Sequence, residues 1–138
     1  MVATLHPQRP RPLSLVITGE AQWWLPALEK IIGPALLAPR RVSGDEELIE
    51  VVQSGRADAA VLDDEADRSL DVLRLLRMIR RFDAMLPVVV VTRRRDRRIL
   101  EDALRLAAFS VVVKPLALEE LLRQIQRMMS RIDRMLSE

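Results

Sequence analysis

Three polar residues follow apolar runs that have the composition of buried strands. Asp63 follows residues 57–62, Thr92 follows residues 88–91, and Lys114 follows residues 111–113. A carboxylate can attack an activated phosphoryl group, and a hydroxyl and an ammonium group can stabilise the negative oxygens of that group. The three side chains are therefore candidates for a single site with phosphate chemistry.

Lys114 is unusual among the basic residues of this chain. Of 22 basic residues, only Lys30 and Lys114 are lysines, and the rest are arginines. Lysine carries a compact charge that can approach one anionic oxygen, whereas arginine brings a wide planar fork. A lysine placed directly between a strand-like run and Pro115 therefore indicates a specific role.

The elements that must position these residues alternate between strand and helix patterns. Strands are predicted near residues 13–18, 36–42, 57–62, 88–91 and 111–113, and helices over 21–32, 45–53, 70–82, 96–109 and 116–138. This alternation predicts a doubly wound α/β fold, with a five-stranded parallel sheet and helices on both faces. In such sheets ligands bind at the carboxyl ends of the strands, where the three candidate residues fall.

Composition limits the class of protein. The chain has 138 residues, 49% of them hydrophobic and 30% charged, which suits one globular domain. We expect a flexible leader over 1–12, a domain over 13–129, and an extension of the last helix over 130–138. The sequence contains no apolar run of about 18 residues and no secretory signal, so we expect a cytoplasmic protein without a membrane span.

Several kinds of chemistry are disfavoured by what the chain lacks. It has no cysteine, and its one histidine, His6, lies in the proline-rich leader, so thiol and imidazole catalysis are excluded. No glycine-rich loop follows the first strand, which argues against a small-molecule enzyme of flavodoxin type. A net charge of +2 does not indicate nucleic-acid binding.

These residues together resemble the receiver domain of two-component response regulators, over about residues 13–129. The resemblance rests on Ala57-Asp58-Ala59-Ala60-Val61-Leu62-Asp63, on Leu86-Pro87-Val88-Val89-Val90-Val91-Thr92, and on Val113-Lys114-Pro115. It implies a flavodoxin-like fold and a signalling module, not an enzyme. It also implies that Asp63 accepts phosphate from a histidine kinase, that Thr92 and Lys114 contact the phosphoryl oxygens, and that the peptide bond before Pro115 is cis.

The chain departs from the family pattern at the metal-binding corner. Thr18 and Gly19 stand where the family usually has two acidic residues that bind magnesium. Magnesium prefers carboxylate oxygens and water, so a hydroxyl and a glycine are poor replacements. The remaining ligands would be Glu20, Asp63 and the backbone carbonyl of Glu65, with Asp64 nearby, and we expect them to bind Mg²⁺ weakly.

Two further departures concern signalling. Val111 replaces the aromatic residue that reports phosphorylation in the family, and Asp67 makes the loop after Asp63 atypical. We therefore expect an atypical receiver, or pseudo-receiver, that works through protein interactions, with weak or absent magnesium-dependent phosphorylation. The alternative is a functional phosphoacceptor receiver that takes phosphate on Asp63.

Two surfaces are candidates for partner contact. The first contains Arg93, Arg94 and Arg97, at the start of a predicted helix where positive charge is unfavourable. It is interpreted either as a solvated face or as a contact for an acidic protein partner, such as a histidine kinase or an output module. Nucleic acid is disfavoured because no aromatic residues interleave with the arginines.

Trp23 and Trp24 are adjacent in the sequence, so only one of the two side chains can pack in the core.

The second surface is the end of the last helix. Apolar residues recur at steps of three and four along it, and this pattern continues through Ile132, Met135 and Leu136. A receiver needs only the first half of such a helix to cover its sheet. We therefore predict either a homodimer formed through this helix or a helical linker to an output module.

Overall fold

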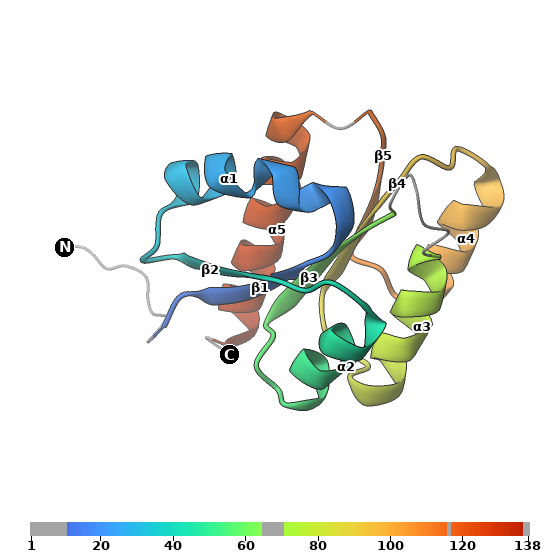
Figure 1. Cartoon of the computed structure of the whole chain (residues 1–138), viewed down its shortest axis with the longest axis horizontal. Helices are drawn as coiled ribbons and strands as arrows, with labels where there is room; N and C mark the ends of the chain where they lie inside the picture. The colour runs from blue at the N-terminus through green and yellow to red at the C-terminus, as the bar shows by residue number, and fades with distance from the viewer. Residues whose placement is uncertain (1–10, 65–70, 116, 137–138) are drawn as a thin grey trace.

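The computed structural model describes residues 11–64, 71–115 and 117–136, with the backbone alone described at 20–22 and 136. Five strands form one parallel sheet in the order β2-β1-β3-β4-β5 (Figure 1). The strands are β1 (Leu13–Ile17), β2 (Leu37–Arg41), β3 (Ala59–Asp63), β4 (Val88–Thr92) and β5 (Ser110–Val113). The predicted leader up to residue 10 and the loop residues Glu65 and Asp67 lie outside the described part.

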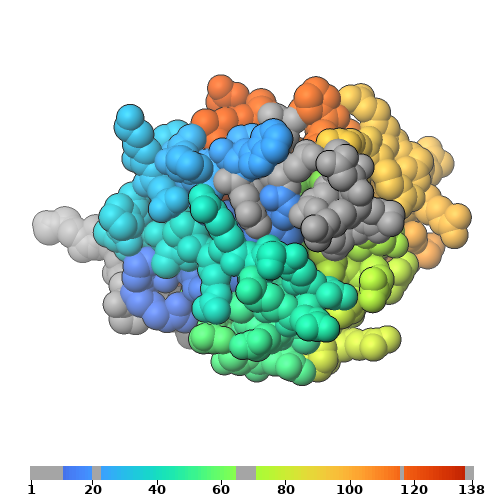
Figure 2. Space-filling view, in the orientation of Figure 1, coloured from blue at the N-terminus to red at the C-terminus, as the bar shows by residue number. Residues whose placement is uncertain are grey.

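Helices cover both faces of the sheet, so the predicted doubly wound α/β fold is confirmed. They are α1 (Leu25–Ile32), preceded by the 3₁₀ turn η1 (Gly19–Trp24), then α2 (Asp45–Gln53), α3 (Val72–Phe82), α4 (Arg97–Arg105) and α5 (Leu118–Leu136). Helices α1 and α5 pack in one apolar cluster, and α2, α3 and α4 pack in the other. Figure 2 shows α1 (light blue) and α4 (gold) on opposite sides of the same view.

Strand β4, which lies between β3 and β5, shows how the sequence specifies these two layers. Val88 and Val90 belong to the cluster beneath α2, α3 and α4, whereas Val89 and Val91 belong to the cluster beneath α1 and α5. Successive side chains of a strand point to opposite faces, so four consecutive valines suit a strand buried on both sides. Thr92 is the last residue of β4, at the carboxyl end of the strand.

Two helix boundaries differ from the prediction by four residues. The helix predicted over 21–32 becomes α-helical only at Leu25, where Pro26 stands in the first turn and suits a helix start. The helix predicted over 96–109 ends at Arg105, because Ala107 adopts a left-handed backbone with φ 59°. Glycine usually occupies such a left-handed position after a helix, so the alanine here gives no sequence signal that the helix ends.

Arg80 links the ends of α3 and α4. Its guanidinium donates to the carbonyl oxygens of Leu106, Asp83 and Ala107, at 2.7, 3.1 and 3.1 Å. The last carbonyl groups of a helix lack partners within the helix, and an arginine can satisfy them. Arg80 therefore holds the left-handed end of α4 against α3.

The second half of α5 packs on the domain as well as extending it. Met129 and Ile132 pack, partly buried, against the apolar cluster that contains α1. Ile132 therefore has an intramolecular role, and its place in the apolar pattern does not by itself require a partner. Met135 is 52% exposed, and the side chain of Leu136 is outside the described part. Across the residues that the structure describes, no helix is long and apolar enough to cross a membrane.

Candidate functional site

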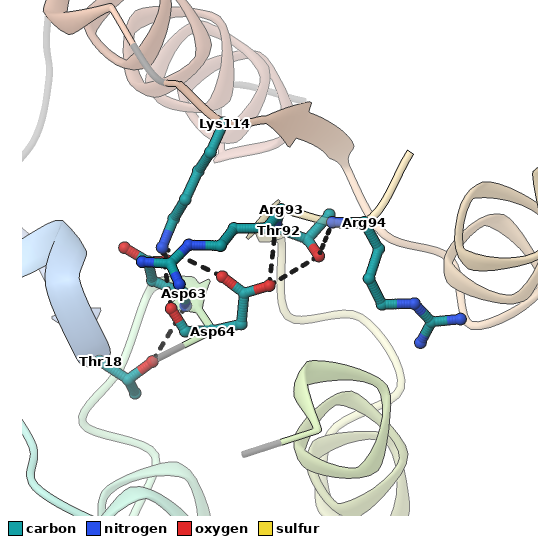
Figure 3. A network of polar contacts seen from close by, with 7 residues as sticks. All are labelled: Thr18, Asp63, Asp64, Thr92, Arg93, Arg94 and Lys114. Atoms are coloured by element: carbon teal, nitrogen blue, oxygen red, sulfur yellow. Dashed lines mark hydrogen bonds and ion pairs between the residues drawn. The ribbon is translucent and has the colours of Figure 1, made fainter. Parts of the chain in front are cut away.

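The carboxyl ends of β3, β4 and β5 bring Asp63, Thr92 and Lys114 together (Figure 3). The parallel register pairs Asp63 with Val91 and Thr92 with Val113, so the three strands end within one residue of each other. The Lys114–Pro115 peptide bond is cis, as the resemblance implied. The site therefore lies where strand ends in this type of sheet bind ligands.

Asp63 is buried beside a lysine. Its side chain has 0% exposed surface, and its Oδ1 atom lies 2.5 Å from Nζ of Lys114, whose side chain is 10% exposed. A buried carboxylate is stable only with a close positive partner or hydrogen bonds. The pair therefore fixes both groups, and it places the ammonium where it can meet negative charge next to Asp63.

Asp64 contacts Thr92, Arg93 and Lys114. Its Oδ2 atom accepts hydrogen bonds from the Thr92 hydroxyl at 2.8 Å and from the Arg93 backbone N–H at 2.9 Å. Nζ of Lys114 lies 3.0 Å from Oδ1 of Asp64 and donates to its backbone carbonyl at 2.8 Å. From the sequence, Asp64 was expected only near a weak metal site, so its contacts with Thr92, Arg93 and Lys114 were not predicted.

The contacts of Asp64 favour its ionised form. Burial raises the pKa of this carboxyl, but the Arg93 N–H, the Thr92 hydroxyl and the Lys114 ammonium together outweigh burial. The pKa of Asp64 is therefore held below its ordinary value. The residue is a carboxylate at neutral pH, and it carries negative charge into the centre of the site.

Thr18 and Gly19 hold the backbone of Asp63. The Thr18 hydroxyl accepts a hydrogen bond from the Asp63 N–H at 3.1 Å. Gly19 has φ +66°, and a Cβ atom at this position would lie 2.5 Å from the Asp63 carbonyl oxygen. The two residues that replace the family's acidic pair thus act as packing and hydrogen-bonding groups.

The described residues do not fit a magnesium ion on their own. Magnesium requires octahedral coordination by oxygen, with one or more carboxylates and several waters. Within the described part of the chain, no three acidic, histidine or cysteine side chains cluster as metal ligands, and Asp63 and Asp64 both contact Lys114. The predicted ligands Glu20, through its side chain, and Glu65 lie outside that part.

The arginine run contributes two backbone donors to the site. Besides the Arg93 N–H on Asp64, the Arg94 N–H donates to the Thr92 hydroxyl at 3.1 Å. The Arg94 guanidinium pairs with Asp96 at 3.1 Å, which raises the pKa of Arg94 and lowers that of Asp96. Arg97 is exposed at the start of α4. Val111 packs, partly buried, against the core.

The fold and the site together define a receiver-type signalling domain, and comparisons with known proteins assign the family. The model of the response regulator receiver domain matches residues 25–126. The chain therefore belongs to the receiver domains of two-component response regulators. Among curated protein sequences, none matches it.

Solved structures support the same fold. A CheY-like receiver domain from Methanospirillum hungatei is 14% identical, with a TM-score of 0.72 over 87% of this chain and 95% of the other. A response regulator from Clostridium difficile is 20% identical, with a TM-score of 0.70 over 88% and 98%. A beryllofluoride-activated NtrC receiver domain is 22% identical, with a TM-score of 0.69 over 88% and 97%.

Proposed function

We propose that this chain is an atypical receiver: a cytoplasmic signalling and protein-interaction module, not an enzyme, in which magnesium-dependent phosphorylation of Asp63 is weak or absent. The observation that carries the proposal is the pair of contacts that the two residues after β1 make with Asp63. Thr18 and Gly19 bind and pack against the Asp63 backbone there, in place of acidic side chains that would hold a cation.

The charges of the site support this proposal. Transfer to Asp63 would bring a phosphoryl group, whose charge approaches −2, beside the Asp64 carboxylate. In phosphoryl transfer, metal ions and basic side chains neutralise such charge. Lys114 already contacts both carboxylates. Without a strong cation site, the added charge is poorly compensated.

The alternative function is a phosphoacceptor that takes phosphate on Asp63 from a histidine kinase. It is favoured by the meeting of Asp63, Thr92 and Lys114 at one sheet edge. Asp63 would attack the phosphorus with one carboxylate oxygen, and the bond from phosphorus to the kinase histidine would break. Lys114 and the Thr92 hydroxyl would then hold the phosphoryl oxygens.

A titration with beryllofluoride and magnesium tests the two alternatives. Trp23 and Trp24 are suitable reporters because both lie in η1, the turn whose first residue, Gly19, packs on Asp63. The atypical receiver gives no saturable fluorescence change, or only a weak one at high magnesium. A tight, saturable change that is lost in Asp63→Ala contradicts the proposal and establishes the phosphoacceptor.

Partner binding supplies a second test. We propose that the protein partner, a histidine kinase or an output module, contacts the arginine surface at Arg94 and Arg97, and that two copies associate through the end of α5. Asp63→Ala should leave partner binding intact, while charge reversal at Arg94 and Arg97 should abolish it. The reverse pattern would show that binding depends on the phosphoacceptor and not on the arginines.

A further inference from the structure

A carboxylate of the chain itself fills the anion-binding part of the site. The Thr92 hydroxyl and the Arg93 N–H donate to one oxygen of Asp64, and the Lys114 ammonium contacts the other. Figure 3 shows the Asp64 carboxylate lying between Thr92 and Lys114. Donors of three kinds, from the ends of two strands, therefore converge on this one group.

The same donors are the ones that a phosphoryl group on Asp63 would need. Asp63 and Asp64 contact the same Nζ atom, at 2.5 and 3.0 Å, so an anion attached to Asp63 would enter the space beside Lys114. The Lys114 ammonium already donates a hydrogen bond to the Asp64 backbone carbonyl and forms ion pairs with both carboxylates.

We propose that Asp64 is an internal anionic ligand of the site, whose carboxylate takes the place of a phosphoryl group and competes with one. The proposal deepens the proposed function, on which it rests, by naming what occupies the site when phosphorylation is weak. It gives Asp64 a role separate from the missing acidic pair at the end of β1.

Competition follows from the strength and the exposure of these contacts. Hydrogen bonds to a carboxylate are about twice as strong as neutral ones, and an attached group meets its donors at high effective concentration. The Asp64 side chain is nevertheless 18% exposed, so an anion from solvent can reach it. An external anion must therefore remove Asp64 from its donors before it can use them.

The first experiment tests occupancy without metal. Amide NMR spectra are compared for the wild type, Asp64→Asn and the control Asp96→Asn at pH 7. Asp96 is a suitable control because it pairs with Arg94 and makes no described contact with Thr92 or Lys114. Asp64→Asn should move the Arg93 amide proton upfield and speed its hydrogen exchange, and Asp96→Asn should not. An Arg93 amide that is the same in Asp64→Asn and the wild type overturns the proposal.

The second experiment tests competition with beryllofluoride at a fixed, high magnesium concentration. Asp64→Ala should bind at least about tenfold tighter than the wild type, the gain expected from one regained charge-assisted hydrogen bond. Asp96→Ala should match the wild type. Equally weak binding, or no binding, by the wild type and Asp64→Ala overturns competition but leaves the atypical-receiver proposal standing. Tight binding by the wild type contradicts the atypical receiver instead, so the two failures are distinguishable.

Discussion

Replacing Gly19 by alanine tests how tightly the chain packs against Asp63 at this position. The added Cβ atom would lie 2.5 Å from the Asp63 carbonyl oxygen and 3.1 Å from its Cβ atom, and the residue would keep φ +66°. A left-handed backbone costs a non-glycine residue about 1–2 kcal/mol. Overpacking against a fixed backbone adds about 1–3 kcal/mol. We therefore expect Gly19→Ala to lower the free energy of unfolding by about 2–5 kcal/mol.

Gly55 provides a matched control for the backbone contribution. It has a similar left-handed conformation, with φ +71°, but a Cβ atom there would meet nothing within 4 Å. Gly55→Ala should therefore lose only about 1–2 kcal/mol. The effect of alanine on the unfolded chain is shared by both variants, so their difference isolates the collision with Asp63.

Urea denaturation followed by tryptophan fluorescence gives both values. A small domain loses about 1–3 kcal/mol of stability per molar urea, so the midpoint of Gly19→Ala should fall by about 1 M or more relative to the wild type. Equal midpoints for Gly19→Ala and Gly55→Ala would refute the argument, since they would show that Asp63 yields to the added atom.

Three further predictions concern other parts of the chain. Arg80→Met removes three hydrogen bonds to helix-end carbonyls, and it should lower the free energy of unfolding by about 1.5–3 kcal/mol in urea denaturation. Pairing with Arg94 lowers the pKa of Asp96, so this ion pair adds slightly to folding stability above pH 3.8, and the added stability is lost as the pH falls. In carboxyl NMR titrations, Arg94→Ala should return the pKa of Asp96 toward 3.8. Ile132→Asn should lower stability because this residue packs on the core, whereas Met135→Lys should leave stability unchanged and, if two copies pair through α5, reduce the mass measured by light scattering.

Elements with strong local signals were predictable from the sequence. Helix α2 spans Asp45–Gln53 as expected, between Gly44 at its N-cap and Gly55 beyond its end. The bounds of strand β4 agree with the predicted strand to within one residue, because four consecutive valines suit a strand that is buried on both faces. The meeting of Thr92 and Lys114 at one edge followed from the parallel topology alone.

The arrangement of acidic groups was not predictable. Asp63 and Asp64 are adjacent, and the alternation of a strand would send their side chains to opposite faces. Strand β3 ends at Asp63, however, and Asp64 then turns its carboxylate toward Thr92 and Lys114. The position of Gly19 against the Asp63 carbonyl likewise depends on tertiary contact. Local patterns carry no information about either contact.

The edge strand β2 limits how copies of this domain can associate. Val42, just after β2, donates its backbone N–H to Ile17 of β1, so Pro39, three residues earlier, lies where an N–H would point away from the sheet. Proline has no N–H, so it removes one outward donor without weakening the pairing with β1. Arg40 and Arg41 add exposed charge beside it. A strand from another molecule therefore pairs poorly with this edge, which disfavours polymerisation through a continuous intermolecular sheet.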